Sequence, residues 1–349
     1  MKLRAIAICL LSICLIATVA YGQDGKTSAS YSNDYYDVSV SFGAYYVGGH
    51  NVMFGNEVGS FLDTVSEGRK IDNKGWTWRV DAAAGLNIRQ PFADRIWLEG
   101  GYWQLDNDTT FTRPATVGGT YYFAPLLTIR DASLGALFNE VTDGNFGSDS
   151  WAVDWNLLAR KDFWGNKSLR AGLVYGLAFR YYSANYNFNM AGFEIDSPLV
   201  LGNNTDLSAF GFGPAVGLAA TAEYDCGLQV DARVLGKFYY TWNSMDAAQI
   251  TYGGQVLSPR IGGAALVERL SIDKQYMAPS VDTKLRISQK LPYGLVGFFE
   301  GTVDYQAGIP EPRYATQSPT IFLGIAQPSG LDEGHMVNYG LQIGLSKSF

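Results

Sequence analysis

Charged side chains of both signs recur at alternate positions in several stretches of this 349-residue chain. Alternate residues of a β-strand share a face, so these side chains would gather on one side of the strands that carry them. If that side is enclosed, the charges either create a transverse field that orients polar solutes or pair with one another and fill the space. A slight excess of basic residues would favour anions in an open lumen. The candidates for this lining are Arg79, Asp81, Arg89, Arg95, Glu99, Asp154, Arg160, Arg170, Arg180, Asp231, Arg233, Lys237, Asp282, Lys284, Arg286, Glu300 and Asp304.

The chain offers little for acid–base catalysis. Its two histidines are His50 and His335. A hydrolase at the outer rim of a membrane protein generally needs a histidine paired with a serine or an aspartate. Neither histidine has a nucleophile at a telling spacing, and two solvated loop histidines are the favoured interpretation. We therefore predict no catalytic residue, and a hydrolase that uses His50 or His335 as a base is the least favoured of the three functions considered for this chain.

Metal binding has equally weak support. Asp106 and Asp108, or Asp143 and Asp149, are acidic pairs in expected loops and are compatible with weak calcium binding. A solvated acidic loop is the simpler interpretation. No His/Cys cluster indicates a transition metal, and we predict no metal and no cofactor.

The N-terminus has the pattern of a secretory signal peptide. Lys2 and Arg4 precede an apolar run over residues 5–19, and small residues stand just before Gln23. Residues 1–22 are therefore expected to be removed on export. The formal net charge would then change from −7 to −9, which gives no support for nucleic-acid binding. Cys226 would be the remaining cysteine, so no internal disulfide is expected.

Ten segments show the period-two alternation of strands. In the segments with the clearest alternation, large apolar residues occupy one face and small, polar or charged residues occupy the other. The thirteen residues at the C-terminus, 337–349, have the same pattern. The ten predicted strands are 36–47, 76–89, 95–105, 150–161, 168–182, 207–221, 228–242, 279–290, 295–305 and 337–349.

The connections alternate between short and long. Short turns follow the second, fourth, sixth and eighth predicted strands, and every other connection is long. The long ones are 48–75, 106–150, 183–206, 243–278 and 306–335. Short turns at one end and long loops at the other are typical of outer-membrane β-barrels. The predicted fold class is therefore an all-β, transmembrane, antiparallel up-and-down barrel of about ten strands, with eight to twelve possible.

Aromatic residues of the apolar face gather near the two ends of the predicted strands. Amphipathic rings sit at the headgroup level of a bilayer, so this placement predicts two belts. The belt nearer the long loops would contain Trp76, Trp78, Tyr102, Trp151, Phe179, Tyr181, Tyr240, Trp242 and Tyr305. The other belt would contain Tyr36, Phe92, Trp164, Tyr293 and Phe349.

The last strand has two expected roles. It must pair with the first strand, 36–47, because strands in lipid cannot leave an edge unpaired. It also resembles the C-terminal signal that the barrel-assembly machinery reads in bacterial outer-membrane proteins, although Lys347 departs from that pattern. The residues of this signal are Tyr339, Leu341, Ile343, Leu345 and Phe349.

A family resemblance covers about a third of the chain, mainly residues 169–242. The stretch 204–242 is similar to a hairpin of the Legionella-type major outer membrane protein family of pore-forming barrels. That family has a Gly-Phe-Gly-Pro-x-x-Gly run, a strand, a tight Cys-Gly turn and another strand. The matching positions here are Gly211, Phe212, Gly213, Pro214, Gly217, Cys226 and Gly227. The resemblance implies a porin-like role. The glycines would leave space in the lumen or let a neighbouring group lie close.

The stretch 125–141 allows two structures. Its apolar residues fit a short helix that folds into the lumen or forms a surface knob. They fit equally well an eleventh and a twelfth strand.

These observations predict one domain, residues 35–349, after a short periplasmic leader, 23–34. The predicted function is a porin-like outer-membrane channel for passive diffusion of small polar solutes or ions. The alternative is a non-conducting barrel that presents its loops for adhesion or recognition, or stiffens the envelope. Expected partners are outer-membrane lipids, the barrel-assembly machinery and small polar solutes or ions. The expected location is the bacterial outer membrane. No oligomeric state is predicted.

Overall fold

The structure of the chain is a computed structural model. It describes residues 36–49, 51–58, 65–88, 90–113, 121–125, 135–138, 140–165, 168–194, 197–253, 265–314, 316–317, 325–327 and 329–349. The predicted signal peptide and leader, His50 and Arg89 lie outside these residues.

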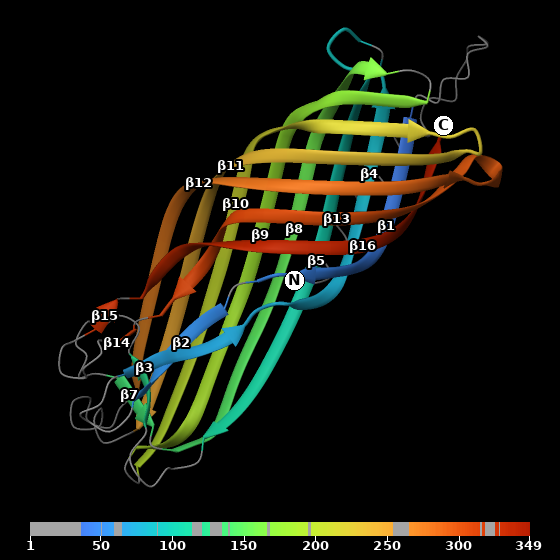
Figure 1. The fold of residues 1–349 in the computed structure, drawn as a ribbon. Helices are drawn as coiled ribbons and strands as arrows, with labels where there is room; N and C mark the ends of the chain where they lie inside the picture. The colour runs from blue at the N-terminus through green and yellow to red at the C-terminus, as the bar shows by residue number, and fades with distance from the viewer. Residues whose placement is uncertain are drawn as a thin grey trace, which may run out of the picture.

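Ten antiparallel strands form a closed barrel (Figure 1). They are β1 (Tyr36–Val47), β4 (Gly75–Asn87), β5 (Arg95–Arg113), β8 (Glu140–Gly165), β9 (Leu169–Glu194), β10 (Ser197–Glu223), β11 (Leu228–Gly253), β12 (Leu266–Lys290), β13 (Leu295–Arg313) and β16 (Gly330–Ser348). Around the ring the order is β1, β16, β13, β12, β11, β10, β9, β8, β5, β4, and β4 pairs with β1 to close it. The predicted fold class and the predicted pairing of the last strand with the first are confirmed.

The short turns lie at one end of the barrel, which we call the turn end. The connection from β10 to β11 and the connection from β12 to β13 take four residues each, 224–227 and 291–294. In the second of these turns Tyr293 adopts a left-handed φ of 64°. The opposite end is called the outer end.

The strands run much further toward the outer end than the sequence indicated. β8, β9, β10, β11 and β12 contain 26, 26, 27, 26 and 25 residues, whereas β1 and β4 contain 12 and 13. The barrel therefore has a tall wall, formed by β8–β12, and a short wall around β1. Four of the predicted long loops are wrong over much of their length, because the barrel strands continue into them. These ranges are 106–150, 183–206, 243–278 and 306–335.

These strand continuations were predicted as loops because the apolar residues change from one face of the strand to the other. Along β9 the large apolar side chains point outward as far as Tyr181. From Tyr182 onward they point inward, at Tyr186 and Phe188, and polar residues take the outward positions. The large apolar residues change from the outward to the inward face at this point. A search for one continuous apolar face therefore ends here, although the strand continues.

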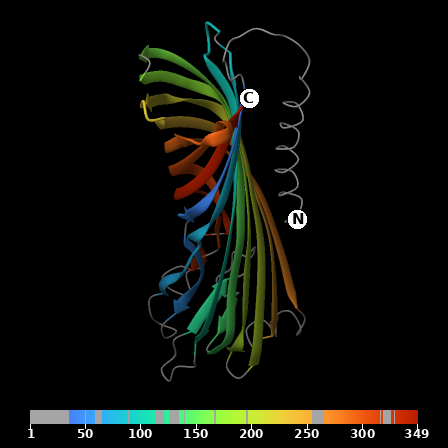
Figure 2. The ribbon, with the colours of Figure 1, turned by 90° about the vertical axis from the view of Figure 1, so that its right-hand side faces the viewer.

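The described residues between the barrel strands form two small sheets. One has the order β3 (Val65–Asp72), β2 (Asn51–Val58), β6 (Tyr121–Pro125), β7 (Gly135–Phe138), and the other pairs β14 (Thr316–Gln317) with β15 (Ile325–Gln327). β2 and β3 face the part of the tall wall that continues past the end of β1 (Figure 2). β6 and β7 therefore belong to a separate sheet rather than to the barrel, and the described part of 125–141 contains no helix.

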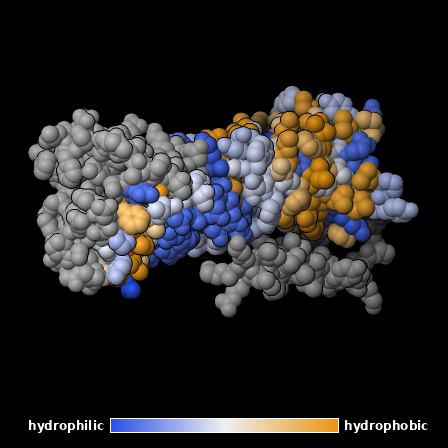
Figure 3. All heavy atoms as spheres, turned by 90° about the horizontal axis from the view of Figure 1, so that it is seen from below, coloured by the Kyte–Doolittle hydropathy of each residue, from blue (hydrophilic) through white to orange (hydrophobic). Residues whose placement is uncertain are grey.

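Outward side chains near the turn end form an apolar band (Figure 3). Leu177, Val234, Leu285 and Ile343 are examples, and each exposes 40–67% of its surface. Aromatic rings border the band on the outer side, where Trp76, Trp78, Tyr181, Tyr240, Trp242, Tyr305 and Tyr339 are exposed. Exposed apolar surface on a closed barrel is stable in lipid, so the band marks the membrane-spanning half. No helix among the described residues is long and apolar enough to cross a membrane.

Glycines in β10 allow two strands to approach closely. A Cβ atom at Gly213 would lie 1.7 Å from the carbonyl oxygen of Phe238, and one at Gly217 would lie 2.0 Å from that of Val234. Gly211 lies under the ring of Tyr239. These glycines were predicted either to leave space in the lumen or to let a neighbouring group lie close. In the structure, neighbouring groups lie close to them.

The substitution Gly213→Ala should destabilise the barrel by about 1–3 kcal/mol, because the new methyl group displaces the β11 backbone. The measurement is the free energy of unfolding in guanidinium, together with heat-dependent migration on a gel. Gly236→Ala is the matched control, since its Cβ would meet its nearest atom at 3.6 Å. Equal stability of the two variants would contradict this account.

Candidate functional site

The interior of the membrane-spanning half contains an ion-pair network. One part of it surrounds Arg79 of β4. Its guanidinium donates to Asp81 at 2.9 Å and to Asp154 of β8 at 3.0 Å, and it lies 3.6 Å from Asp304 of β13. The Tyr45 hydroxyl donates to Asp304 at 2.7 Å. Three strands that are not neighbours in the ring are thus joined through one cation.

The second part of the network crosses the lumen from β11 and β12. Arg233 donates to Glu99 of β5 at 2.6 and 2.9 Å, across the barrel, and lies 3.5 Å from Asp282. Lys237 contacts the same Asp282 at 3.2 Å. A charge in the interior of a barrel must be paired or hydrated, and here each of these groups has a protein partner.

The predicted cross-strand pair Arg286–Glu300 is also present. The two residues are register partners on β12 and β13, and the guanidinium contacts the carboxylate at 2.7 Å. Lys284 lies 3.6 Å from Glu300 and 4.0 Å from Glu99, and so links this pair to Arg233.

The remaining predicted lining residues lie nearer the turn end or apart from the network. Arg160 pairs with Asp162 at 2.6 Å and donates to Thr221, which in turn donates to Asp231. Arg170 pairs with Glu223 at the exposed rim, where both side chains are more than 40% exposed. These residues therefore belong to the turn-end opening rather than to the closed middle of the barrel. Arg180 is buried without an ion pair among the described residues.

The middle of the lumen is nearly filled. A cavity of about 20 Å³ lies among Arg79, Asp154, Lys237 and Asp304. That volume accommodates one or two water molecules.

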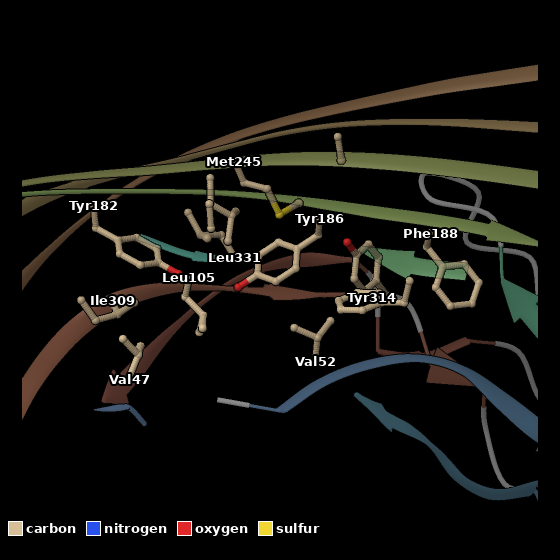
Figure 4. Close-up of a cluster of buried hydrophobic side chains, with 14 of the residues drawn as sticks. Val47, Val52, Leu105, Tyr182, Tyr186, Phe188, Met245, Ile309, Tyr314 and Leu331 are labelled. Carbon is tan, nitrogen blue, oxygen red and sulfur yellow. The ribbon is translucent and has the colours of Figure 1, made fainter. Parts of the chain in front are cut away.

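A second closure lies toward the outer end. The inward apolar side chains of the tall wall pack against β2, β13 and β16 in a buried cluster that we call the outer core (Figure 4). Tyr182, Tyr186 and Met245 come from the tall wall, while Val52 and Leu331 come from the opposite side. Each of them is at most 1% exposed. The outer core is therefore packed like the interior of a soluble β-sandwich.

Sequence reasoning missed several groups of this interior. Tyr45 and Gln342 complete the network around Asp81 and Asp304, through hydrogen bonds from the phenol and from the amide. Both stand at alternate positions that face the lumen in the predicted strands, so the period-two alternation could have identified them. The alternation could not identify the outer core, because its residues lie beyond the point where the apolar residues move from the outward to the inward face.

Of the two histidines, the structure describes His335. His335 lies on β16, points outward and is exposed, and its ring is 6.1 Å from that of Tyr305. Its predicted place in a loop is wrong. No group of three or more His, Cys, Asp or Glu residues that could hold a metal ion occurs in the described ranges.

The proposed assembly signal is displayed on the lipid-facing side. Tyr339, Leu341, Ile343, Leu345 and Phe349 are each 42–67% exposed. Lys347 places its ammonium 5.0 Å from the centre of the Phe349 ring, which accommodates the one charge in this stretch. Recognition by the assembly machinery stays a prediction.

Comparison with known proteins gives no family match. No family model and no curated protein sequence matches the chain. Among solved structures it is similar to the outer membrane protease OmpT from Escherichia coli, with 13% identity over 92% of this chain and 99% of that chain and a TM-score of 0.45. It is also similar to a major outer membrane protein from Thermus thermophilus, with 9% identity, 90% and 99% coverage and a TM-score of 0.28. A third similar structure is a Pseudomonas aeruginosa FadL homologue, with 8% identity over 90% of this chain and 90% of that chain and a TM-score of 0.23.

These scores are all below 0.5, so the activities of those proteins are not transferred to this chain. The closed ring and the apolar band define the class on their own. The chain is a membrane-spanning β-barrel of the outer-membrane type.

Replacing Arg233 with Met should destabilise the folded barrel by about 3 kcal/mol, because Glu99 and Asp282 lose a buried partner. The double variant Arg233→Met/Glu99→Gln should lose less than the sum of its two single changes. The control is Arg170→Met, whose exposed pair with Glu223 contributes less than about 1 kcal/mol. The measurement is unfolding by guanidinium. A loss from Arg233→Met as small as that of the control would refute a stabilising network.

The outer end should show a pH dependence that involves Glu311. This residue faces Asp332 across β13 and β16. Burial, and after it the charge of Asp332, raises the pKa of Glu311 above its usual range. A carboxyl whose folded-state pKa is raised stabilises the fold most fully at pH below the unfolded value, about 4.3, and loses this contribution as the pH rises through the folded value.

Glu311→Gln should therefore weaken the decline in thermal stability as the pH is raised from about 4 toward neutrality. The measurement is the unfolding midpoint of each variant as a function of pH. Glu333→Gln, at the exposed neighbouring position, is the control and should leave the profile unchanged. An unaltered profile for Glu311→Gln would show that this carboxyl has no role in it.

Proposed function

We propose that the protein is a non-conducting barrel of the bacterial outer membrane that holds a folded β-structure at the cell surface for recognition or adhesion. The observation that carries this proposal is the double closure of the lumen. The Arg233–Glu99 pair crosses the barrel within the membrane-spanning half. The outer core then fills the space toward the outer end.

The geometry of the tall wall supports the same proposal. β8–β12 continue well past the apolar band with polar side chains outward and apolar side chains inward. A barrel that merely spans the membrane has no use for a second hydrophobic core beyond it. Such a core supports a rigid surface on which other residues are displayed. Export by the predicted signal peptide, with the outer end on the outside of the cell, completes the proposal.

A porin-like channel is the second candidate. It is favoured by the polar lining of the membrane-spanning half, where charges of both signs point inward. The resemblance to the Legionella-type family supports the same candidate. In this alternative the ion pairs rearrange and the outer core moves aside to let small polar solutes or ions pass.

The two candidates differ in electrical conductance. The experiment uses the refolded mature chain, 23–349, in a planar bilayer at high salt, with heat-modifiable migration as proof of folding. We expect no stable current steps. Steps whose ion selectivity changes when Arg233 and Lys237 are neutralised would reject the closed barrel and establish the channel. Steps that those substitutions do not change would reject both the closed barrel and the assigned lining.

A further inference from the structure

Arg180 is a buried cation that forms no ion pair among the described residues, and the carboxylates of Asp154 and Glu333 act on it at longer range. It lies on β9 with 3% of its surface exposed. Its register partner on β8 is Asp154, but the carboxylate of Asp154 is turned to Arg79. Among the described residues no carboxylate forms an ion pair with Arg180. A buried guanidinium that stays charged calls for a compensating negative charge nearby.

Neutral groups hold the Arg180 side chain in place. A bulge in β13 turns two carbonyl groups into the lumen, and Arg180 donates to that of Ala307 at 2.9 Å and to that of Gly308 at 3.5 Å. The ring of Tyr239 lies 4.6 Å from the guanidinium carbon. Gly308 has a φ of 68°, and a Cβ there would lie 2.4 Å from that of Ala278. These contacts orient the guanidinium but supply no negative charge.

The 20 Å³ cavity adjoins this side chain. Its lining contains four cationic side chains and three carboxylates. The cationic ones are Arg79, Arg180, Lys237 and Lys284, and the carboxylates are those of Asp154, Asp282 and Asp304. Closer to the turn end the balance is reversed, with Asp81, Glu99 and Glu300 against Arg233 and Arg286. The cavity therefore lies at the positive pole of the ion-pair network.

Several buried donors of the cavity lining have no hydrogen-bond partner within the part of the chain that the structure describes. They are the Nε of Arg180, the Oγ of Ser280 and the Oγ1 of Thr302. The Oε1 of Gln306, which also lines the cavity, is an unpartnered acceptor as placed, and a flip of the amide would turn a donor to the same position. The Oδ1 of Asp282 is an unpartnered acceptor, but Lys237 and Arg233 neutralise this carboxylate through its other oxygen. Unpartnered N–H and O–H groups on residues that line a small cavity can donate to an anion, and a charged partner strengthens such hydrogen bonds.

We propose that this cavity binds a monatomic anion of the halide type, which in solution is chloride. The lining has one more cation than carboxylates, which disfavours a metal cation. The volume excludes phosphate, sulfate and carboxylate anions, because it holds only one or two water-sized bodies. Bound chloride would supply the negative charge that Arg180 lacks. The proposal depends on the packed interior and is independent of whether the outer end binds a partner.

The test is diffraction from crystals of the refolded mature chain grown in sodium bromide, with data collected at the bromine edge. We expect an anomalous peak within contact distance of the Nε of Arg180 and the Oγ of Ser280. Electron density in the cavity without an anomalous signal would mean water only. Peaks confined to the protein surface would mean an adventitious ion only. Either result would overturn the proposal.

Stability in solution gives a second, independent measurement. The unfolding midpoint of the unaltered chain should be higher in sodium chloride than in sodium gluconate at equal ionic strength. Arg180→Gln should abolish this difference, and Ser280→Ala, which keeps the charge, should reduce it. Arg170→Gln is the control and should retain the full difference. An equal midpoint in the two salts for the unaltered chain would also overturn the proposal.

Discussion

The hydrogen bonding of the backbone in lipid is the constraint on which the rest of the structure depends. No water reaches the hydrocarbon region, so each strand must pair on both edges. β1 completes the ring by pairing with β4 on one side and β16 on the other. At twelve residues it is the shortest strand of the ring, and it sets the height to which the barrel is closed. Beyond Val47 the ring is open between β5 and β16, and the inner face of the tall wall is covered there by β2 and by the ends of β13 and β16.

The same constraint explains the two kinds of interior. Inside the apolar band the outward positions are taken by large apolar residues, and the inward positions are left to small or charged ones. Ten strands leave too little room for a water-filled pore, so the inward charges pair across the lumen. Past the band the outward side meets water, and the apolar residues move inward. One sheet therefore contains a polar interior and an apolar interior in succession, with the bulge at Gly308 near their boundary.

Much of the membrane-spanning half could be predicted from sequence because its pattern is local. Alternation and short connections are enough to predict the turns, the inward orientation of Arg79 and Glu300, and the pairing of Arg286 with Glu300. The partners across the lumen could not be predicted in this way. Arg233 and Glu99 lie on strands that are not neighbours in the ring, and their contact depends on the barrel circumference. The extent of β9 and β10 was missed because alternation was read as one continuous face, although the solvent around the strand changes from lipid to water near Tyr181.

The uninterrupted passage of β8–β12 from the apolar band to the outer end also has a mechanical consequence. In many surface proteins a flexible linker joins the membrane anchor to the displayed domain. Here the membrane-spanning half and the part beyond it belong to one hydrogen-bonded sheet, and strands such as β10 run without a break for 27 residues. Tilting the outer part relative to the membrane would require shearing this sheet. The outer part of the barrel therefore keeps a fixed inclination and height relative to the bilayer, set by the tilt of the strands within it.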